Sequence, residues 1–402
     1  MAQLTIIDIL DESWWIAVVA MAVSLIATPV VRFIAYRYRI VDRPDELLKP
    51  HGRPIAYLGG LAMCAGLLVG LACCIVTLPN PAKNWEELKT CVGSLRWTLL
   101  RFNPLWNLMG LALSSIAITI VGLLDDLLKL KPRQKILGQV LAAGILLLGG
   151  VGFRMSGVVF SLLGVSPPDW VAMPAGCIIC VITVIATCNA TNFLDGLDGL
   201  CGGVTGIIAL GFLGLAVFLA QYGNVPGNDE LRVGLCLAMA GAVLGFLPYN
   251  VPPASIFMGD AGSMLLGFFV AAMMALFCRE GTPRWFLAAW VVFALPTLDT
   301  SLAVVRRFLA GKSIFAGDRS HLYDQLVDRG MTVKQVVILF YFLAAVAAAV
   351  GVSAAAGLRL RYAFPIYVAF FAAAWVVFHK RGMIRPTRKG QCGAGEQGRK
   401  ED

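Results

Sequence analysis

Long apolar runs, each about long enough to cross a lipid bilayer, follow one another along almost the whole chain. A helix needs about 20 mostly apolar residues to span the hydrocarbon core. The pattern therefore predicts an all-α polytopic membrane protein with about eleven transmembrane helices. The predicted spans lie near residues 14–36, 55–78, 104–124, 136–153, 169–188, 200–221, 232–248, 263–279, 284–305, 335–357 and 361–379.

The basic residues between the spans predict the orientation of the chain, because cytoplasmic loops carry an excess of Lys and Arg. The loops after the first, third and ninth spans, together with the tail, hold 22 of the 33 Lys and Arg residues. We therefore expect the N-terminus outside and the C-terminus in the cytoplasm. No Lys or Arg precedes Arg32, so the first span lacks the charged start of a cleavable signal peptide and is expected to be retained.

Two regions follow from this map. Residues 1–379 form the predicted membrane domain, and residues 380–402 form a polar, basic tail without apolar periodicity. We expect this tail to be disordered near the anionic inner leaflet.

Composition agrees with a membrane protein. The 402 residues are 58% hydrophobic and only 14% charged, whereas an ordinary soluble domain has roughly 25% charged residues. The net charge of +9 does not indicate nucleic acid, because the basic residues lie between membrane spans. Most of the eleven cysteines lie inside apolar runs, where they behave as small apolar residues.

Six aspartates gather on the predicted cytoplasmic side, each at or just beyond the end of a span. They are Asp125, Asp126, Asp195, Asp198, Asp260 and Asp318. A lone Asp at the bilayer centre costs about 2.5 to 3.5 kcal/mol on insertion scales, whereas an Asp at the membrane surface can face water and ligand. The sequence therefore predicts one wet, acidic face.

The adjacent pair Asp125 and Asp126 suggests a cation site. Two carboxylates about 4 Å apart repel by roughly 4 kcal/mol at an effective dielectric near 20, and a divalent cation would relieve that repulsion. Magnesium is usually held by one or two carboxylates, water and substrate phosphates. A solvated helix end is the alternative interpretation of this pair.

Two glycine-containing segments are more specific. The segment 192–199 places Asp195 and Asp198 three residues apart, on one face if the segment is helical. Asp260 lies between two glycines at the start of a span, near a helix N-terminus that favours anions. We interpret both segments as ligand sites for a metal ion or phosphate.

The longest predicted cytoplasmic loop mixes several basic residues with Asp318 and His321, a composition suited to a charged sugar nucleotide. Of the three histidines, His379 ends the last span and is interpreted as interfacial, whereas His51 and His321 are candidates for the site. We place His321 in this hydrophilic loop, outside the packed spans, and expect folding not to depend on it.

Taken together, these segments resemble the polyprenyl-phosphate N-acetylhexosamine-1-phosphate transferases of glycosyltransferase family 4, with the motifs in order. The matching segments are Asp42-Arg-Pro, His51-Gly-Arg-Pro-Ile-Ala-Tyr-Leu-Gly-Gly60, Gly122-Leu-Leu-Asp125-Asp126-Leu-Leu-Lys129, Asn189-Ala-Thr-Asn192-Phe-Leu-Asp195-Gly-Leu-Asp198-Gly, Phe257-Met-Gly-Asp260-Ala-Gly-Ser and Asp318-Arg-Ser-His321-Leu.

The resemblance implies transfer of a sugar 1-phosphate from a UDP-amino sugar to polyprenyl phosphate, with release of UMP, as the start of cell-envelope glycan synthesis. It also implies Mg²⁺, or Mn²⁺ in its place, and a bacterial inner membrane enzyme whose active site faces the cytoplasm. No nucleic acid partner is expected, and a homodimer is left open.

The resemblance further assigns roles by position. The implied catalytic residues are Asp125 and Asp126, near the acceptor phosphate, and His321. The implied metal ligands are Asp260 and Asp195. The implied substrate-binding residues are His51, Lys129, Asn192, Asp195, Asp198 and Arg319.

One difference from the motifs of this family concerns the identity of the donor sugar. Tyr323 and Asp324 stand where bacterial relatives often carry two further histidines. The branch that uses UDP-N-acetylmuramoyl-pentapeptide typically shows three consecutive histidines, so the chain is expected to be closer to the branch that uses UDP-N-acetylglucosamine. Residue types leave open whether an Asp first forms a phospho-enzyme, and we favour direct attack by the lipid phosphate.

A transporter is the main alternative, because multi-span chains with intramembrane acids often move ions and Asp299 lies within the ninth predicted span. Transporter acids would gather near the midplane, whereas most acids here lie at span ends. A non-catalytic scaffold or lipid-binding protein is a third class, but it needs no acidic groups facing one compartment. The sequence therefore favours the enzyme.

Overall fold

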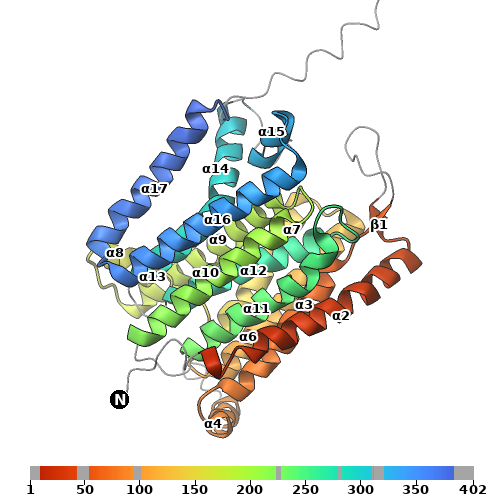
Figure 1. Ribbon diagram of the computed structural model, residues 1–402. Helices are drawn as coiled ribbons and strands as arrows, with labels where there is room; N and C mark the ends of the chain where they lie inside the picture. The colour runs from red at the N-terminus through yellow and green to blue at the C-terminus, as the bar shows by residue number, and fades with distance from the viewer. Residues whose placement is uncertain are drawn as a thin grey trace, which may run out of the picture.

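The computed structural model describes residues 10–42, 54–94, 101–222, 228–278, 283–309, 311 and 321–383. Long helices dominate this part of the chain and lie side by side in one bundle (Figure 1). One short antiparallel pair of strands, β1 (Val41–Asp42) and β2 (Ile55–Ala56), adjoins the bundle. The predicted all-α class is confirmed.

Among the described residues, nine helices are long and apolar enough to cross a membrane, so the chain is a multi-pass membrane protein. They are α2 (Trp15–Arg37), α3 (Gly59–Thr77), α6 (Pro104–Leu128), α9 (Asp169–Leu194), α10 (Leu200–Tyr222), α11 (Asn228–Asn250), α12 (Gly259–Phe277), α16 (Val333–Gly357) and α17 (Leu360–Lys380).

The other helices are shorter. They are α4 (Pro81–Gly93), α7 (Pro132–Leu148), α8 (Ser156–Leu162), α13 (Pro283–Val292), α14 (Ala294–Leu309) and α15 (Leu322–Asp328). The α13–α14 pair counts as a tenth span only if its two halves, bent by 71°, are taken together.

The predicted number of eleven spans exceeds what helix length supports. Each predicted span falls on a helix or on the α13–α14 pair, but α7 has only 17 residues. The ninth predicted span is broken rather than continuous. Pro296, in the first turn of α14, cannot donate a backbone hydrogen bond to the preceding turn, which favours a break there.

Glycines allow close packing of α11 against α2. A Cβ added at Gly241 would lie 2.2 Å from the carbonyl oxygen of Ala17, and one added at Gly245 would lie 2.3 Å from that of Met21. Only glycine permits such an approach of two backbones. The two helices therefore form a tight pair on one side of the bundle.

Helix α12 is the most enclosed of the candidate spans. Of its membrane-length window 94% is buried, against 11% for α17. It packs against α3, α6 and α9. The C-terminal ends of α6 and α9 lie beside the first turn of α12, which contains Asp260.

The ends of the bundle differ in character. Figure 1 shows α15 and β1 at one end and α4 at the opposite end. Hydrogen bonds join the last turns of α6 and α9 to the first turn of α12. Lys135, in the first turn of α7, also contacts Asp260 in the first turn of α12. The predicted gathering of acidic groups at one end of the spans is confirmed for the aspartates that the structure describes.

Candidate active site

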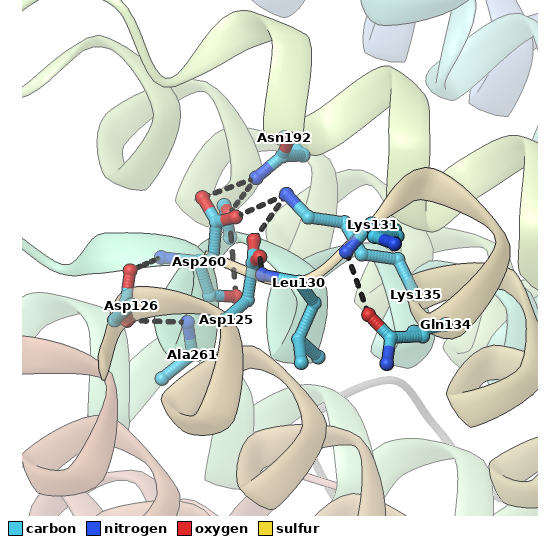
Figure 2. A network of polar contacts seen from close by, with 10 residues as sticks. Asp125, Asp126, Leu130, Lys131, Gln134, Lys135, Asn192, Asp260 and Ala261 are labelled. Atoms are coloured by element: carbon cyan, nitrogen blue, oxygen red, sulfur yellow. Dashed lines mark hydrogen bonds and ion pairs between the residues drawn. The ribbon is translucent and has the colours of Figure 1, made fainter. Parts of the chain in front are cut away.

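Lys135 lies between two aspartates that come from different helices (Figure 2). Its Nζ is 2.7 Å from Asp260 Oδ2, and it also pairs with Asp125 Oδ2. Asp125 belongs to the last turn of α6, Lys135 to the first turn of α7 and Asp260 to the first turn of α12. Three helix ends thus converge on one shared ammonium group.

Sequence reasoning missed Lys135 as a site residue. The only signal was its place in the short basic loop after the third predicted span, where four Lys and Arg residues lie together. Of these four residues the family resemblance assigns a role to Lys129 but not to Lys135. The structure shows that Lys135 points inward, whereas Arg133 in the same loop is exposed.

Asp126 has different partners from its neighbour Asp125. Its Oδ1 accepts a hydrogen bond from the backbone N–H of Asp260 at 2.8 Å, and its Oδ2 accepts one from Ala261 at 3.1 Å. The first backbone N–H groups of a helix have no partner within the helix and favour a negative charge. Asp126 therefore caps α12 from outside and anchors Asp260.

Gly122 makes this anchoring possible. A Cβ added at Gly122 would lie 2.4 Å from the carbonyl oxygen of Asp260. The glycine lies one helical turn before Asp126 on α6, so α6 can approach the start of α12 closely enough for the cap to form.

Asn192, at the end of α9, completes the surroundings of Asp260. Its Nδ2 lies 2.8 Å from Asp260 Oδ1 and 2.9 Å from the hydroxyl oxygen of Ser263. Both carboxylate oxygens of Asp260 therefore have a donor, one from Lys135 and one from Asn192. Such charge-assisted hydrogen bonds hold the carboxylate in one orientation.

Asp195 and Asp198 lie in the turn between α9 and α10, so the segment is not helical there. Asp198 Oδ2 accepts a hydrogen bond from the backbone N–H of Ala254 at 2.9 Å and so supports the segment after α11. The carboxylate of Asp195 has no hydrogen-bond or ion-pair partner among the described residues, although its backbone N–H donates to the carbonyl of Asn192 at 3.2 Å. Burial, together with the negative charges of Asp260, Asp126 and Asp198, raises the pKa of Asp195 well above its usual value.

The side chain of His321 does not lie in hydrophilic surroundings, so our expectation of an unpacked position is wrong. Its side chain is buried, and Nδ1 lies 2.7 Å from Asp299 Oδ2. The backbone N–H of Leu322 donates to the other oxygen of Asp299, also at 2.7 Å. His321 immediately precedes α15, which is held against α14 through Asp299 and thereby encloses the imidazole.

Aromatic rings surround this imidazole. The ring of Tyr323 stacks on it with 5.6 Å between centroids and 6° between planes, and the ring of Phe193 lies 5.5 Å away. The hydroxyl of Tyr323 donates to the carbonyl of Phe193 at 3.1 Å. Because Phe193 follows Asn192 in sequence, His321 adjoins the aspartate cluster through the end of α9.

The remaining predicted residues either lie outside the described residues or, within them, make no side-chain contact with the aspartate cluster. His51, Arg319 and Asp318 lie outside the described residues. Lys129 caps the end of α6 with its backbone N–H on the carbonyl of Asp125, 2.9 Å away, and its side chain is exposed at the same end of the bundle.

The side chains of this cluster can be compared with the ligands that a divalent ion requires. No three His, Cys, Asp or Glu side chains within the described ranges are grouped so that they alone would hold a metal. Asp125 and Asp260 nevertheless share one cation, the ammonium of Lys135, and the partnerless carboxylate of Asp195 is close enough for Asp260 to raise its pKa. Such a set fits an ion whose coordination is completed by water and substrate phosphates.

Comparisons with known proteins identify a matching family. The model of the family described as glycosyl transferase family 4 matches residues 108–278, which include both Asp125 and Asp260.

Three relatives illustrate the similarity. A probable undecaprenyl-phosphate N-acetylglucosaminyl 1-phosphate transferase of Bacillus subtilis is 29% identical over 83% of this chain and 84% of its own. A decaprenyl-phosphate N-acetylglucosaminephosphotransferase of Mycobacterium tuberculosis is 30% identical over 83% of this chain and 80% of its own. A phospho-N-acetylmuramoyl-pentapeptide-transferase of Limosilactobacillus reuteri is 32% identical over 67% of this chain and 80% of its own.

Proposed function

Because the chain belongs to glycosyl transferase family 4, we propose that it transfers N-acetylglucosamine 1-phosphate from UDP-N-acetylglucosamine to polyprenyl phosphate and releases UMP. Two of the relatives carry names for this transfer, with undecaprenyl and decaprenyl phosphate as acceptors. The observation that carries the proposal is the convergence of Asp125, Asp260 and Lys135 at one end of a membrane-spanning bundle.

The chemistry of this reaction requires positive charge in the site. An oxygen of the lipid phosphate attacks the phosphorus that carries the sugar, and the bond from that phosphorus to the bridging oxygen of the donor breaks. The bridging oxygen leaves with UMP. Two anionic groups must therefore meet, which costs energy unless fixed cations lie beside them. Lys135 is one such cation, held by two carboxylates.

We expect a Mg²⁺ ion, with Mn²⁺ as the alternative, to bind beside this lysine. Asp260 and Asp195 would hold it, because the carboxylate of Asp195 has no partner among the described residues and its pKa is raised by the charge of Asp260. When bound, the ion neutralises charge on the substrate phosphates.

The two adjacent aspartates are proposed to act differently. Both oxygens of Asp126 are engaged by backbone N–H groups, so this side chain positions the start of α12. Asp125 accepts from the backbone N–H of Leu130 with one oxygen and pairs with Lys135 through the other. Asp125 is the better candidate to face the acceptor phosphate, because its ion pair with a lysine can rearrange when an anion binds.

His321 is proposed to contact a substrate phosphate through its second ring nitrogen. Asp299 engages Nδ1, which fixes the direction of the ring and leaves Nε2 for a ligand. An imidazole N–H at this position can donate to a phosphate oxygen.

An apolar cavity of about 680 Å³ between α14, α15, α16 and α17 suits the polyprenyl chain. It reaches Leu298 and Leu322, which are the sequence neighbours of Asp299 and His321. Arg329 and Arg381 also line it and are exposed, so the cavity combines an apolar interior with basic side chains. We propose that the chain of the acceptor lies here.

The proposed location is the bacterial cytoplasmic membrane, with this end of the bundle in the cytoplasm. The excess of Lys and Arg in the loops at this end supports that orientation. UDP-sugars and the acidic site would then face the same compartment.

The experiment that tests the proposal uses purified full-length protein in neutral detergent with UDP-N-acetylglucosamine, undecaprenyl phosphate and Mg²⁺. We expect UMP and a lipid-linked diphosphate sugar in equal amounts. Release of UDP instead would indicate an ordinary glycosyltransferase. Turnover with UDP-N-acetylmuramoyl-pentapeptide but not with UDP-N-acetylglucosamine would refute the proposed donor.

A further inference from the structure

A second cavity, of about 380 Å³, lies outside the aspartate cluster, between the last turns of α2 and the segment that follows α11. Its wall includes Arg32, Phe33 and Tyr36 of α2, Ile55 of β2, and Ala254 and Ser255. The reaction proposed above uses none of these side chains.

Arg32 gives this cavity its charge. Of the described residues that line it, Arg32 alone is charged. The side chain is partly buried and has neither a carboxylate nor a hydrogen-bond partner among the described residues. A cation within a membrane span is costly unless it reaches water or an anion.

Arg32 lies near the C-terminal end of the membrane-length helix α2. Helix α2 ends at Arg37, so Arg32 lies five residues from the end of the helix, which is about 7.5 Å along the axis at a rise of about 1.5 Å per residue. The side chain can extend from this position towards water at the end of the helix. The cavity around Arg32 also offers room for a ligand group.

The outer wall of the cavity is aromatic. Pro29, Arg32, Phe33 and Tyr36 share one face of α2, and Phe33 and Tyr36 are 71% and 47% exposed. The hydroxyl of Tyr36 donates to the carbonyl of Pro54 at 3.3 Å. Exposed aromatic side chains at helix ends lie at the boundary between headgroups and acyl chains.

We propose that this cavity binds the phosphate of an anionic glycerophospholipid, such as phosphatidylglycerol, whose acyl chains lie along Phe33. A guanidinium can donate two parallel hydrogen bonds to a phosphate, and its positive charge selects an anionic over a zwitterionic headgroup. In the orientation proposed above, the cavity opens towards the cytoplasmic leaflet, where anionic lipids are present.

The inner wall of the cavity connects to the active site. The backbone N–H of Ala254 donates to Asp198 at 2.9 Å, and the hydroxyl of Ser255 donates to the carbonyl of Tyr249 at 2.9 Å. Asp260 follows only a few residues after this wall. A lipid bound at Arg32 would therefore brace the segment that leads into the active site.

The test measures binding of dioleoyl phosphatidylglycerol and dioleoyl phosphatidylcholine to the purified full-length protein by native mass spectrometry and thermal unfolding. We expect phosphatidylglycerol to bind more tightly and to raise the unfolding temperature of the wild type. Arg32→Gln should weaken its binding by about tenfold or more, because a charge-assisted hydrogen bond is lost. Arg32→Lys should retain part of the preference.

Arg37→Gln is the control, because Arg37 is an arginine at the end of the same helix but is exposed and does not line the cavity. It should bind phosphatidylglycerol like the wild type. An equal loss in Arg37→Gln, or no loss in Arg32→Gln, would overturn the site. Displacement of phosphatidylglycerol by one equivalent of undecaprenyl phosphate would show that the occupant is the acceptor lipid, and the proposal would then be wrong.

Discussion

The imidazole of His321 and the carboxylate of Asp299 form a buried pair, with Nδ1 and Oδ2 2.7 Å apart. Asp299 was the one residue that supported a transporter, because it lies within a predicted span. Its two oxygens are instead engaged by His321 and by the backbone N–H of Leu322. The acid within the span therefore orients a histidine beside the proposed active site.

This pair predicts linked effects on activity and stability. Asp299→Asn should lower kcat by about 10- to 100-fold, because the imidazole loses the carboxylate that orients it. Asp299→Ala should also lower the free energy of unfolding by roughly 1 to 3 kcal/mol, since buried donors lose their acceptor. Steady-state kinetics and denaturation in detergent measure both effects. Tyr323→Phe, which keeps the stacked ring, is the control and should retain most of the activity.

Lys135 is predicted to be essential for turnover. Lys135→Ala should lower kcat by about 100-fold or more, because a fixed cation beside the phosphates is removed and Asp125 and Asp260 are left to repel each other. Lys135→Arg should keep part of the activity. Arg133→Ala removes an exposed cation from the same turn of α7 and serves as the control. Similar losses in both alanine variants would mean that only the net charge of the loop matters.

Substitutions of Asp125 and Asp126 are predicted to have different effects on activity and on stability. Asp126→Ala removes the cap of α12 and should lower the free energy of unfolding by about 0.5 to 2 kcal/mol, with loss of activity. Asp125→Asn should abolish most of the activity while the unfolding transition stays close to that of the wild type. Thermal unfolding and product formation, measured on the same preparations, distinguish the two roles. An unfolding temperature lowered more by Asp125→Asn than by Asp126→Ala would contradict this assignment.

Asp324 predicts a pH dependence of stability. Burial, with a contribution from the charge of Asp299, raises the pKa of Asp324 from 3.8 to about 6 in the folded protein, although the charge of His321 opposes the shift. The folded state therefore holds this proton more tightly than the unfolded state, so its contribution to stability is complete below about pH 4 and is lost as the pH rises towards 6. Asp324→Asn should flatten the unfolding temperature between these pH values. An unchanged pH profile in this variant would exclude Asp324 as the group responsible.

Several features of the protein were determined by the sequence alone. Each apolar run prefers the hydrocarbon because of its own transfer free energy, so the helices and their approximate limits could be predicted segment by segment. The aspartates at span ends could be placed on one side for the same reason. The resemblance to a known family followed from short motifs whose residues are contiguous in the chain.

Other features were decided only by tertiary structure. Lys135 meets Asp125 and Asp260 because three helix ends converge, although 125 positions separate Lys135 from Asp260 in sequence. Asp126 caps α12, whereas its neighbour Asp125 faces the lysine, because adjacent residues on a helix point in different directions. His321 became buried because α15 is held against α14 through Asp299. Hydropathy sets where each helix forms, but the pairing of polar side chains depends on how the helices pack against one another, and no single segment of sequence carries that information.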